Sequence, residues 1–264
     1  MKTSNTTRAT CRLAGLLLIA GLTWAEAAFV ILQDGRRIEG QRIRSRRNGD
    51  VILTTESGEV TFTQGQYREA WADRPAAIDE AEQHLQAGRY PQAVSVLEPI
   101  VSEYRFLGWD IRAMALMGQA QLAAEQFASA LATYERLFRE HPRRREDPGI
   151  FWGYFQALLR TGAYDQLRTN LDRVIAVGER SQAARAQVMR GDMHRAQGRA
   201  EDGLLDYLRT VVFFQQEREV QPEALFKAGV LLEEMRDERA QAMFRQVAEQ
   251  YPQSPYAAQA REKL

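Results

Sequence analysis

Along most of the chain, apolar residues recur at the spacing of amphipathic helices, and turn residues interrupt that pattern at regular distances. Successive turn residues are 37, 37 and 36 positions apart: Gly88, Glu125, Gly162 and Gly198. A fixed period in this range is typical of stacked helical units, each of which buries its apolar face only against its neighbours. Residues 75–264 are therefore predicted to form an α-solenoid of about five helix pairs plus a terminal helix.

Each unit also repeats one internal order of small and aromatic residues. The second unit has Gly118 before its turn, Phe127 and Ala130 after it, and Pro142 at its end. These offsets resemble those of the tetratricopeptide repeat, in which a small residue sits where the two helices of a pair cross. The period near 37 is longer than the usual value of about 34 residues, and the loops between units are expected to hold the extra residues.

Two units depart from the repeat pattern. The third has Phe155 in place of the small crossing residue. The fourth has Ala200 in place of an aromatic and Gly203 in place of alanine, so its helix pair is predicted to be the loosest. The end of the chain, from Tyr251 onward, reads YPQSPYAAQAREKL. It resembles repeats of periplasmic Tol-Pal accessory proteins and of outer-membrane assembly lipoproteins, which implies a role in the cell envelope.

A second pattern precedes the helical region, where short β-rich runs alternate with turn signals between residues 28 and 70. Asn48-Gly49 is a strong hairpin signal because both residues tolerate positive φ. Four strands are predicted: Phe29–Leu32, Ile38–Ser45, Val51–Thr55 and Val60–Thr63. Strands at this spacing indicate a small all-β module, either a meander or a barrel that resembles SH3-like folds in layout.

Arginine is concentrated in this β module. The six residues are Arg36, Arg37, Arg42, Arg44, Arg46 and Arg47. One interpretation is an anion-binding face for lipid head groups, glycans or an acidic partner, with peripheral membrane association. The other, which we favour, is a solvated edge that prevents strand-to-strand aggregation.

The first 27 residues have the three parts of a secretory signal: a basic start, the apolar run Leu13–Ala25, and small residues at Ala25 and Ala27. Cleavage is predicted after Ala27, which would place the protein in a periplasm or cell envelope. The alternative is a segment that stays as a membrane anchor. Cys11, the only cysteine, lies in this segment. A processed protein would therefore have no disulfide, thiolate metal site or cysteine nucleophile.

Composition and motifs argue against catalysis. The 35 basic and 35 acidic residues balance, so no strong field favours nucleic acid. The three histidines have no spacing typical of a zinc site, and phosphate-binding, dinucleotide-binding and nucleophile-elbow motifs do not occur. The prediction is a protein that is not an enzyme and needs neither metal nor cofactor.

The resemblance to tetratricopeptide repeats implies that first helices line a concave groove that holds a segment of a partner protein. Carried onto this sequence, the groove residues are Arg112, Gln119, Leu122, Trp152, Gln156, Arg160, Arg185, Asp192 and Arg195. Arginines beside a tryptophan are suited to an acidic peptide or a C-terminal carboxylate. Burial between repeats is the alternative role for Trp152.

The predicted function is a non-catalytic envelope scaffold or adaptor that binds protein segments in this groove. Two alternatives remain open at this point. The chain is an accessory subunit of an envelope enzyme, or it binds glycan or lipid through the arginine-rich β module.

Overall fold

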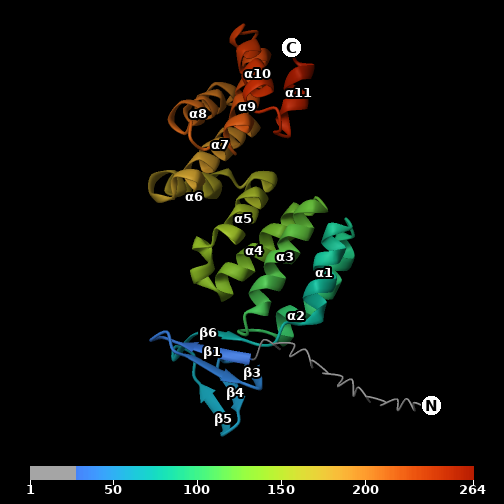
Figure 1. The fold of residues 1–264 in the computed structure, drawn as a ribbon, viewed down its shortest axis with the longest axis vertical. Coiled ribbons are helices and arrows are strands. Elements are labelled where there is room, and N and C mark those ends of the chain that lie inside the picture. The colour runs from blue at the N-terminus through green and yellow to red at the C-terminus, as the bar shows by residue number, and fades with distance from the viewer. Residues whose placement is uncertain (1–27) are drawn as a thin grey trace, which may run out of the picture. The chain divides into compact units, whose positions relative to one another are not determined.

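The computed structural model describes residues 28–264, which belong to two compact units, Met1–Arg74 and Pro75–Leu264 (Figure 1). In the described residues the first unit is built of β-strands and the second of helices. The predicted mainly α fold, a solenoid of helix pairs preceded by a small β region, is confirmed. The predicted secretory signal lies outside the described residues. From residue 28 onward, no helix is long and apolar enough to cross a membrane.

The β unit contains two antiparallel three-stranded sheets, with strand orders β2-β1-β6 and β3-β4-β5. The strands are β1 Ala28–Leu32, β2 Arg37–Gly40, β3 Arg42–Ser45, β4 Val51–Thr55, β5 Gly58–Phe62 and β6 Tyr67–Trp71. The sheets do not close into a barrel. Val30 on β1 and Val51 and Leu53 on β4 are fully buried, so both sheets contribute side chains to the core.

The predicted single strand Ile38–Ser45 is in fact two strands that belong to different sheets. Gly40 pairs with Ala28 in the first sheet, whereas the next residue, Gln41, donates its backbone N–H to the Thr54 carbonyl at 2.8 Å. A Cβ atom on Gly40 would lie 2.6 Å from that carbonyl oxygen, so only glycine fits the bend. Ile38 and Ile43 are five positions apart, so the alternation of apolar residues changes phase at this bend.

Strand β6 was also missed by the sequence pattern. It runs antiparallel to β1 and completes the first sheet, with Trp71 opposite Phe29 and Ala70 opposite Val30. Its central residues are Arg68 and Glu69, whose charge hides the strand from a search for apolar alternation.

The helical unit has five helix pairs followed by α11. The first helices are α1 Ala76–Gln86, α3 Trp109–Ala123, α5 Pro148–Thr161, α7 Arg180–Ala196 and α9 Gln221–Glu234. The second helices are α2 Tyr90–Glu103, α4 Phe127–Glu140, α6 Tyr164–Val177, α8 Ala200–Phe213 and α10 Arg239–Gln250. Helix α11 spans Tyr256–Glu262, and the loop after α4 forms a short 3-10 helix, Pro142–Glu146.

One residue in the left-handed conformation ends the first helix of every pair. These residues are Gly88, Glu125, Gly162, Gly198 and Arg236, with φ of 70°, 58°, 78°, 73° and 58°. A left-handed residue commonly closes a helix, and glycine adopts this conformation without strain. The regular turn residues in the sequence therefore have a backbone cause, and Arg236 fills that role in the fifth unit.

Three of the pairs cross through a glycine on the first helix and an aromatic ring on the second. A Cβ atom at Gly118 would lie 2.5 Å from the Tyr134 ring, and one at Gly229 would lie 2.7 Å from the Phe244 ring. Gly191 and Tyr207 make the same close contact. Each ring is fully buried and occupies the space that a side chain in place of the glycine would need.

The third pair reverses this arrangement, and it is the loosest one. Phe155 occupies the position of the crossing glycine on α5 and is 1% exposed, while Leu171 occupies the position of the ring on α6. Helices α5 and α6 contact each other less than the helices of the other pairs do. The prediction that the fourth pair is loosest is wrong. A Cβ atom on Gly203 would lie 3.0 Å from the Gly191 carbonyl, so glycine lets α8 approach α7 closely.

Candidate partner-binding groove

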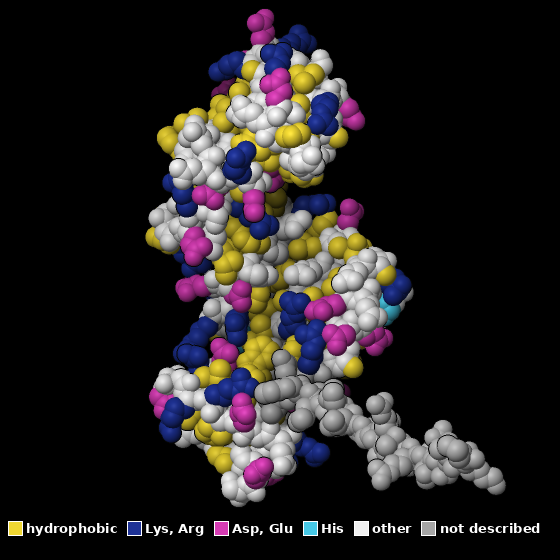
Figure 2. All heavy atoms as spheres, viewed as in Figure 1, with side chains coloured by type: hydrophobic (Ala, Val, Ile, Leu, Met, Phe, Trp, Pro, Cys, Tyr) yellow, Lys and Arg dark blue, Asp and Glu magenta, His cyan; other side chains and the backbone are white. Residues whose placement is uncertain are grey.

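The predicted groove residues all lie on first helices, namely α3, α5 and α7. Six are exposed, and three are half-buried. The exposed ones are Arg112, Gln119, Gln156, Arg160, Arg185 and Arg195, and the half-buried ones are Leu122, Trp152 and Asp192. Figure 2 shows hydrophobic side chains in a strip over the region of α3, α4 and α5, with charged side chains on both sides. The contacts of each groove residue decide which of them face a partner.

Arg112 is engaged within the chain. Its guanidinium donates a hydrogen bond to the Glu82 carboxylate on α1, with a nitrogen–oxygen distance of 2.6 Å. This ion pair links the first helices of units one and two. Arg112 therefore supports the stacking of these units, and its charge is already balanced.

Asp192 is engaged in the same way, from α7 to the next first helix. It accepts hydrogen bonds from the Lys227 ammonium on α9 at 2.7 Å and from the Tyr207 hydroxyl on α8 at 2.7 Å. The ammonium also donates to Glu223 at 2.6 Å. Burial lowers the pKa of Lys227, but the two carboxylates outweigh burial and raise it above its ordinary value. The lysine is therefore charged and joins α7 to α9.

Arg195 makes a third link between first helices. It pairs with Glu234 on α9 at 2.7 Å. Arg160 at the end of α5 lies apart from these pairs, because its guanidinium stacks on the Phe127 ring at the start of α4, 3.9 Å from the ring centre.

Trp152 and Arg185 meet across neighbouring first helices. The guanidinium carbon of Arg185 on α7 lies 4.4 Å from the centre of the Trp152 ring on α5. Trp152 also packs on Phe151 and Phe155, with ring centres 4.9 and 5.6 Å apart. The tryptophan is thus both a packing residue and a platform. In residues 28–264, Arg185 has no carboxylate partner.

Gln119 on α3 and Gln156 on α5 occupy the same position in successive units. Both are exposed, and their side-chain amides have no hydrogen-bond partner within the described chain. Glu82 and Asp192 occupy the matching positions in units one and four, where basic residues hold them. These four equivalent positions form a row along the first helices. Ion pairs engage the residues of the row in units one and four, and the two glutamines between them are free to bind a partner.

Sequence reasoning missed the partners that close the row. Glu82, Lys227 and Glu234 were not predicted as site residues, although each contacts one. One signal was present: Glu82 and Asp192 are acidic residues at equivalent repeat positions, and an arginine or lysine on the next first helix is their natural partner.

A buried charge network lies beside the row, between α7 and α8. Asp206, 2% exposed, accepts hydrogen bonds from Gln187 at 2.6 Å and from Arg190 at 2.9 Å. Arg190 also donates to Asp172 on α6 at 2.7 Å. His194 lies 3.5 Å from Asp206, and burial, followed by the charge of Arg199, lowers its pKa. The hydrogen bonds of Arg190 and Asp206 hold α6, α7 and α8 together, whereas the buried Nδ1 atom of His194 has no hydrogen-bond partner in the described chain.

The other two histidines are far along the chain from this network. His141 contacts the fully buried Asp110 carboxylate at 2.9 Å, and His84 accepts a hydrogen bond from Arg89 at 2.9 Å. Within the residues that the structure describes, no three His, Cys, Asp or Glu side chains are arranged to hold a metal ion.

The six arginines of the predicted anion-binding face divide into two sets. Three are paired with acidic neighbours: Arg36 with Asp34 at 2.7 Å, Arg37 with Glu39 at 3.1 Å, and Arg44 with Glu59 at 3.0 Å. The other three, Arg42, Arg46 and Arg47, are exposed and form no ion pair from residue 28 onward. An anion-binding face would consist of this second set, and it stays a prediction.

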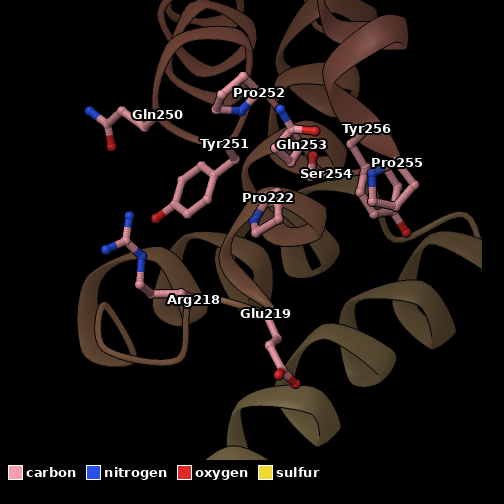
Figure 3. Close-up of a pocket in the computed structure, with 10 residues that line it drawn as sticks. All are labelled: Arg218, Glu219, Pro222, Gln250, Tyr251, Pro252, Gln253, Ser254, Pro255 and Tyr256. Atoms are coloured by element: carbon pink, nitrogen blue, oxygen red, sulfur yellow. The ribbon is translucent and has the colours of Figure 1, made fainter.

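A recess of about 480 Å³ lies near the C-terminal end of the helical unit. Figure 3 shows Tyr251 with its hydroxyl directed toward the side where Arg218 lies and Pro222 beside it, while Pro255 and Tyr256 lie on the opposite side. The lining residues come from the α8–α9 loop, the start of α9, and the α10–α11 loop with the helix ends on both sides of it. Tyr256 on α11 packs on Phe226, with ring centres 5.5 Å apart. The recess is open to solvent and separate from the groove residues in the sequence.

Comparison with known proteins supports the repeat architecture. Residues 112–143 and 223–254 match the family model of the tetratricopeptide repeat. These segments correspond to α3 with α4 and to α9 with α10. No curated protein matches the chain.

Solved structures share the fold at low sequence identity. MamA from Desulfovibrio magneticus RS-1 is 18% identical with a TM-score of 0.52, over 68% of this chain and 96% of that one. A putative kinesin light chain from Podosopora anserina with nearly identical TPR-like repeats is 16% identical with a TM-score of 0.53, over 65% of this chain and 92% of that one. These similarities establish a solenoid of the tetratricopeptide type.

Proposed function

We propose that the helical unit is a non-catalytic binding module that holds an extended segment of another protein against α3, α5 and α7. The observation that carries this proposal is the guanidinium of Arg185. It lies on the Trp152 ring without a carboxylate, while Arg112, Asp192 and Arg195 are paired within the chain. The shared repeat fold supports a role in binding, since stacked helix pairs form extended surfaces for other molecules.

The geometry assigns a separate role to each open residue. The amides of Gln119 and Gln156 each offer donors and an acceptor, which suits the backbone of an extended peptide. Arg185 offers a planar fork that binds a carboxylate through two hydrogen bonds, and the Trp152 ring fixes the plane of that fork. The segment that fits is therefore an extended one with an acidic side chain or C-terminal carboxylate near α7.

We also propose that this binding takes place outside the cytoplasm, in a periplasm or cell envelope. The support is the pattern of residues 1–27, with its basic start, its apolar run and its small residues at Ala25 and Ala27. The partner would then be an envelope protein.

Site-directed photo-crosslinking tests the groove. A photo-reactive amino acid at Gln156 should capture partner protein in intact cells, and Arg185→Glu in the same chain should reduce that capture about tenfold or more. A hydrogen bond between charged groups contributes roughly 1.5–3 kcal/mol, which corresponds to a change of this size. Circular dichroism should show unchanged helicity, because Arg185 forms no ion pair within the described chain.

The control places the same photo-reactive residue at Arg173, an exposed position on the second helix α6. It should give little adduct. Equal capture from both positions, or capture at Gln156 that Arg185→Glu leaves intact, would contradict the groove. Arg112 is unsuitable for this test because its replacement breaks the ion pair with Glu82.

A further inference from the structure

The helices of the solenoid form two blocks, α1 to α5 and α6 to α11. Within the first block α5 packs on α3 and α4, and within the second block α6 packs on α7. Between the blocks α5 and α6 contact each other less than the helices of the other pairs do. Figure 1 shows the two groups of helices joined where α5 ends.

Side-chain size explains the weak contact at this junction. In the second, fourth and fifth pairs a glycine on the first helix receives a buried ring from the second helix. In the third pair the large side chain, Phe155, is on α5 and the smaller one, Leu171, is on α6. The other pairs have glycine or, in the first pair, Ala81 at the crossing position, so with Phe155 there the two backbones cannot approach as closely. The covalent link is short, since Gly162 and Ala163 alone separate the helices.

The first helices on the two sides of the junction, α5 and α7, are joined by a contact between side chains. Ion pairs tie first helices at two other places, α1 to α3 through Glu82 and Arg112, and α7 to α9 through Asp192 and Lys227. Between α5 and α7 the tie is the stacking of Arg185 on Trp152. Stacking of this kind holds the two groups at a given separation but is weaker than a half-buried ion pair.

We propose that the α5–α6 turn is a hinge and that the contact between Arg185 and Trp152 is the latch that sets the angle between the two blocks. The hinge follows from packing alone. A further consequence rests on the function proposed above: Gln119 and Gln156 lie on the first block and Arg185 on the second, so a bound segment spans the hinge. Binding and the angle between the blocks are then coupled.

Distances between spin labels test the hinge in the full chain, without any partner. One label is placed on α2 by Ser95→Cys and one on α10 by Ala242→Cys, in a chain with Cys11→Ser. Ser95, Ala242 and the control position Ser129 are all exposed. The control pair, Ser95→Cys with Ser129→Cys, lies within the first block. Trp152→Ala should either broaden the distance distribution across the hinge to at least about twice its width or shift its mean. The distribution of the control pair should stay unchanged.

Arg185→Gln should act like Trp152→Ala, because it removes the charge from the stacked group and keeps most of its length. A distance distribution across the hinge that neither broadens nor shifts in either variant would overturn the proposal. Broadening of both label pairs would overturn it too, because it would show general loosening. Since no partner is present, this outcome is independent of the crosslinking result at Gln156.

Discussion

At the scale of single residues, Tyr134 shows how the repeat converts a small residue into tight packing. Its ring fills the space left by Gly118 on α3, and its hydroxyl end reaches Gly153 on α5. The side chain is 1% exposed. One tyrosine therefore contacts two successive first helices, which explains why small residues are needed on both of them.

The burial of Tyr134 predicts a loss of stability at alkaline pH. Burial raises the pKa of its hydroxyl above the ordinary value, so the folded state keeps a proton that the unfolded state releases above about pH 10. The free energy of unfolding should then fall as pH rises beyond that value, by up to about 1.4 kcal/mol per pH unit for this group. Urea unfolding at about pH 8 and about pH 11 measures the fall.

Tyr134→Phe should make that fall smaller, because phenylalanine has no proton to release. The control is Phe138→Leu, a change in an equally buried ring on the same helix. It should lower stability by a similar amount at both pH values. If Tyr134→Phe and the unchanged protein lose the same free energy between the two conditions, the tyrosine is not the group responsible.

The sequence predicts which helix each groove residue lies on, but it does not predict which of these residues form ion pairs. The repeat offsets correctly placed Arg112, Trp152 and Arg185 on first helices. They could not show that Arg112 is paired and Arg185 is not, because pairing depends on which side chain the next helix brings into reach. Glu82 is 30 positions from Arg112 in the sequence, and only the stacking of the units brings them together.

At the scale of helices and strands, ion pairs tie neighbouring first helices at two places, α1 to α3 and α7 to α9. The link between α7 and α9 is the most enclosed of them, since Lys227 is held by Asp192 and Glu223 on a surface where all three are half-buried. Enclosed pairs with several hydrogen bonds contribute more than exposed ones, because solvent screens them less.

Lys227→Met should therefore lower the free energy of unfolding by roughly 1.5–3 kcal/mol, because it removes the ammonium that donates to both carboxylates. Lys263→Met is the matched control. Lys263 pairs with Glu233 at 2.6 Å, but both side chains are 40% exposed, so its loss should cost under about 1 kcal/mol. Urea titrations of the two variants give both values. Similar losses in the two would show that enclosure of the pair adds nothing.

Prediction of the fold succeeded where the pattern comes from local packing and failed where it depends on distant partners. The period of the turn residues gave five helix pairs and α11, since each turn has its own backbone cause. The split of Ile38–Ser45 was missed because it depends on Thr54, which a different part of the chain supplies. The loose pair was misplaced because Gly203 acts through its contact with the Gly191 backbone rather than through lost bulk.

At the scale of the whole molecule, the chain combines a small β unit with a long helical unit. The open residues of the groove lie in the middle of the helical unit, and Arg42, Arg46 and Arg47, the unpaired arginines of the predicted anion-binding face, lie in the β unit. The two kinds of surface are therefore on different units, and each can be altered without changing residues of the other.

The proposed export makes a prediction about the intact protein. The chain recovered from the periplasmic fraction should begin at Ala28, because a signal peptidase recognises small residues at the positions of Ala25 and Ala27. N-terminal sequencing of that fraction gives the answer. Ala27→Arg serves as the control, since it removes the small residue next to the cut and should leave the longer chain. Recovery of the unaltered chain in the cytoplasm would contradict export.

The bend at Gly40 has a consequence for how the β unit can be divided. One stretch of backbone supplies β2 to the first sheet and β3 to the second, so neither sheet has a boundary of its own. Removing β1 and β6 would leave β2 unpaired beside β3, and removing β4 and β5 would do the same to β3. We therefore expect that the two sheets cannot be separated by truncation, and that a graft of the β unit has to include all six strands.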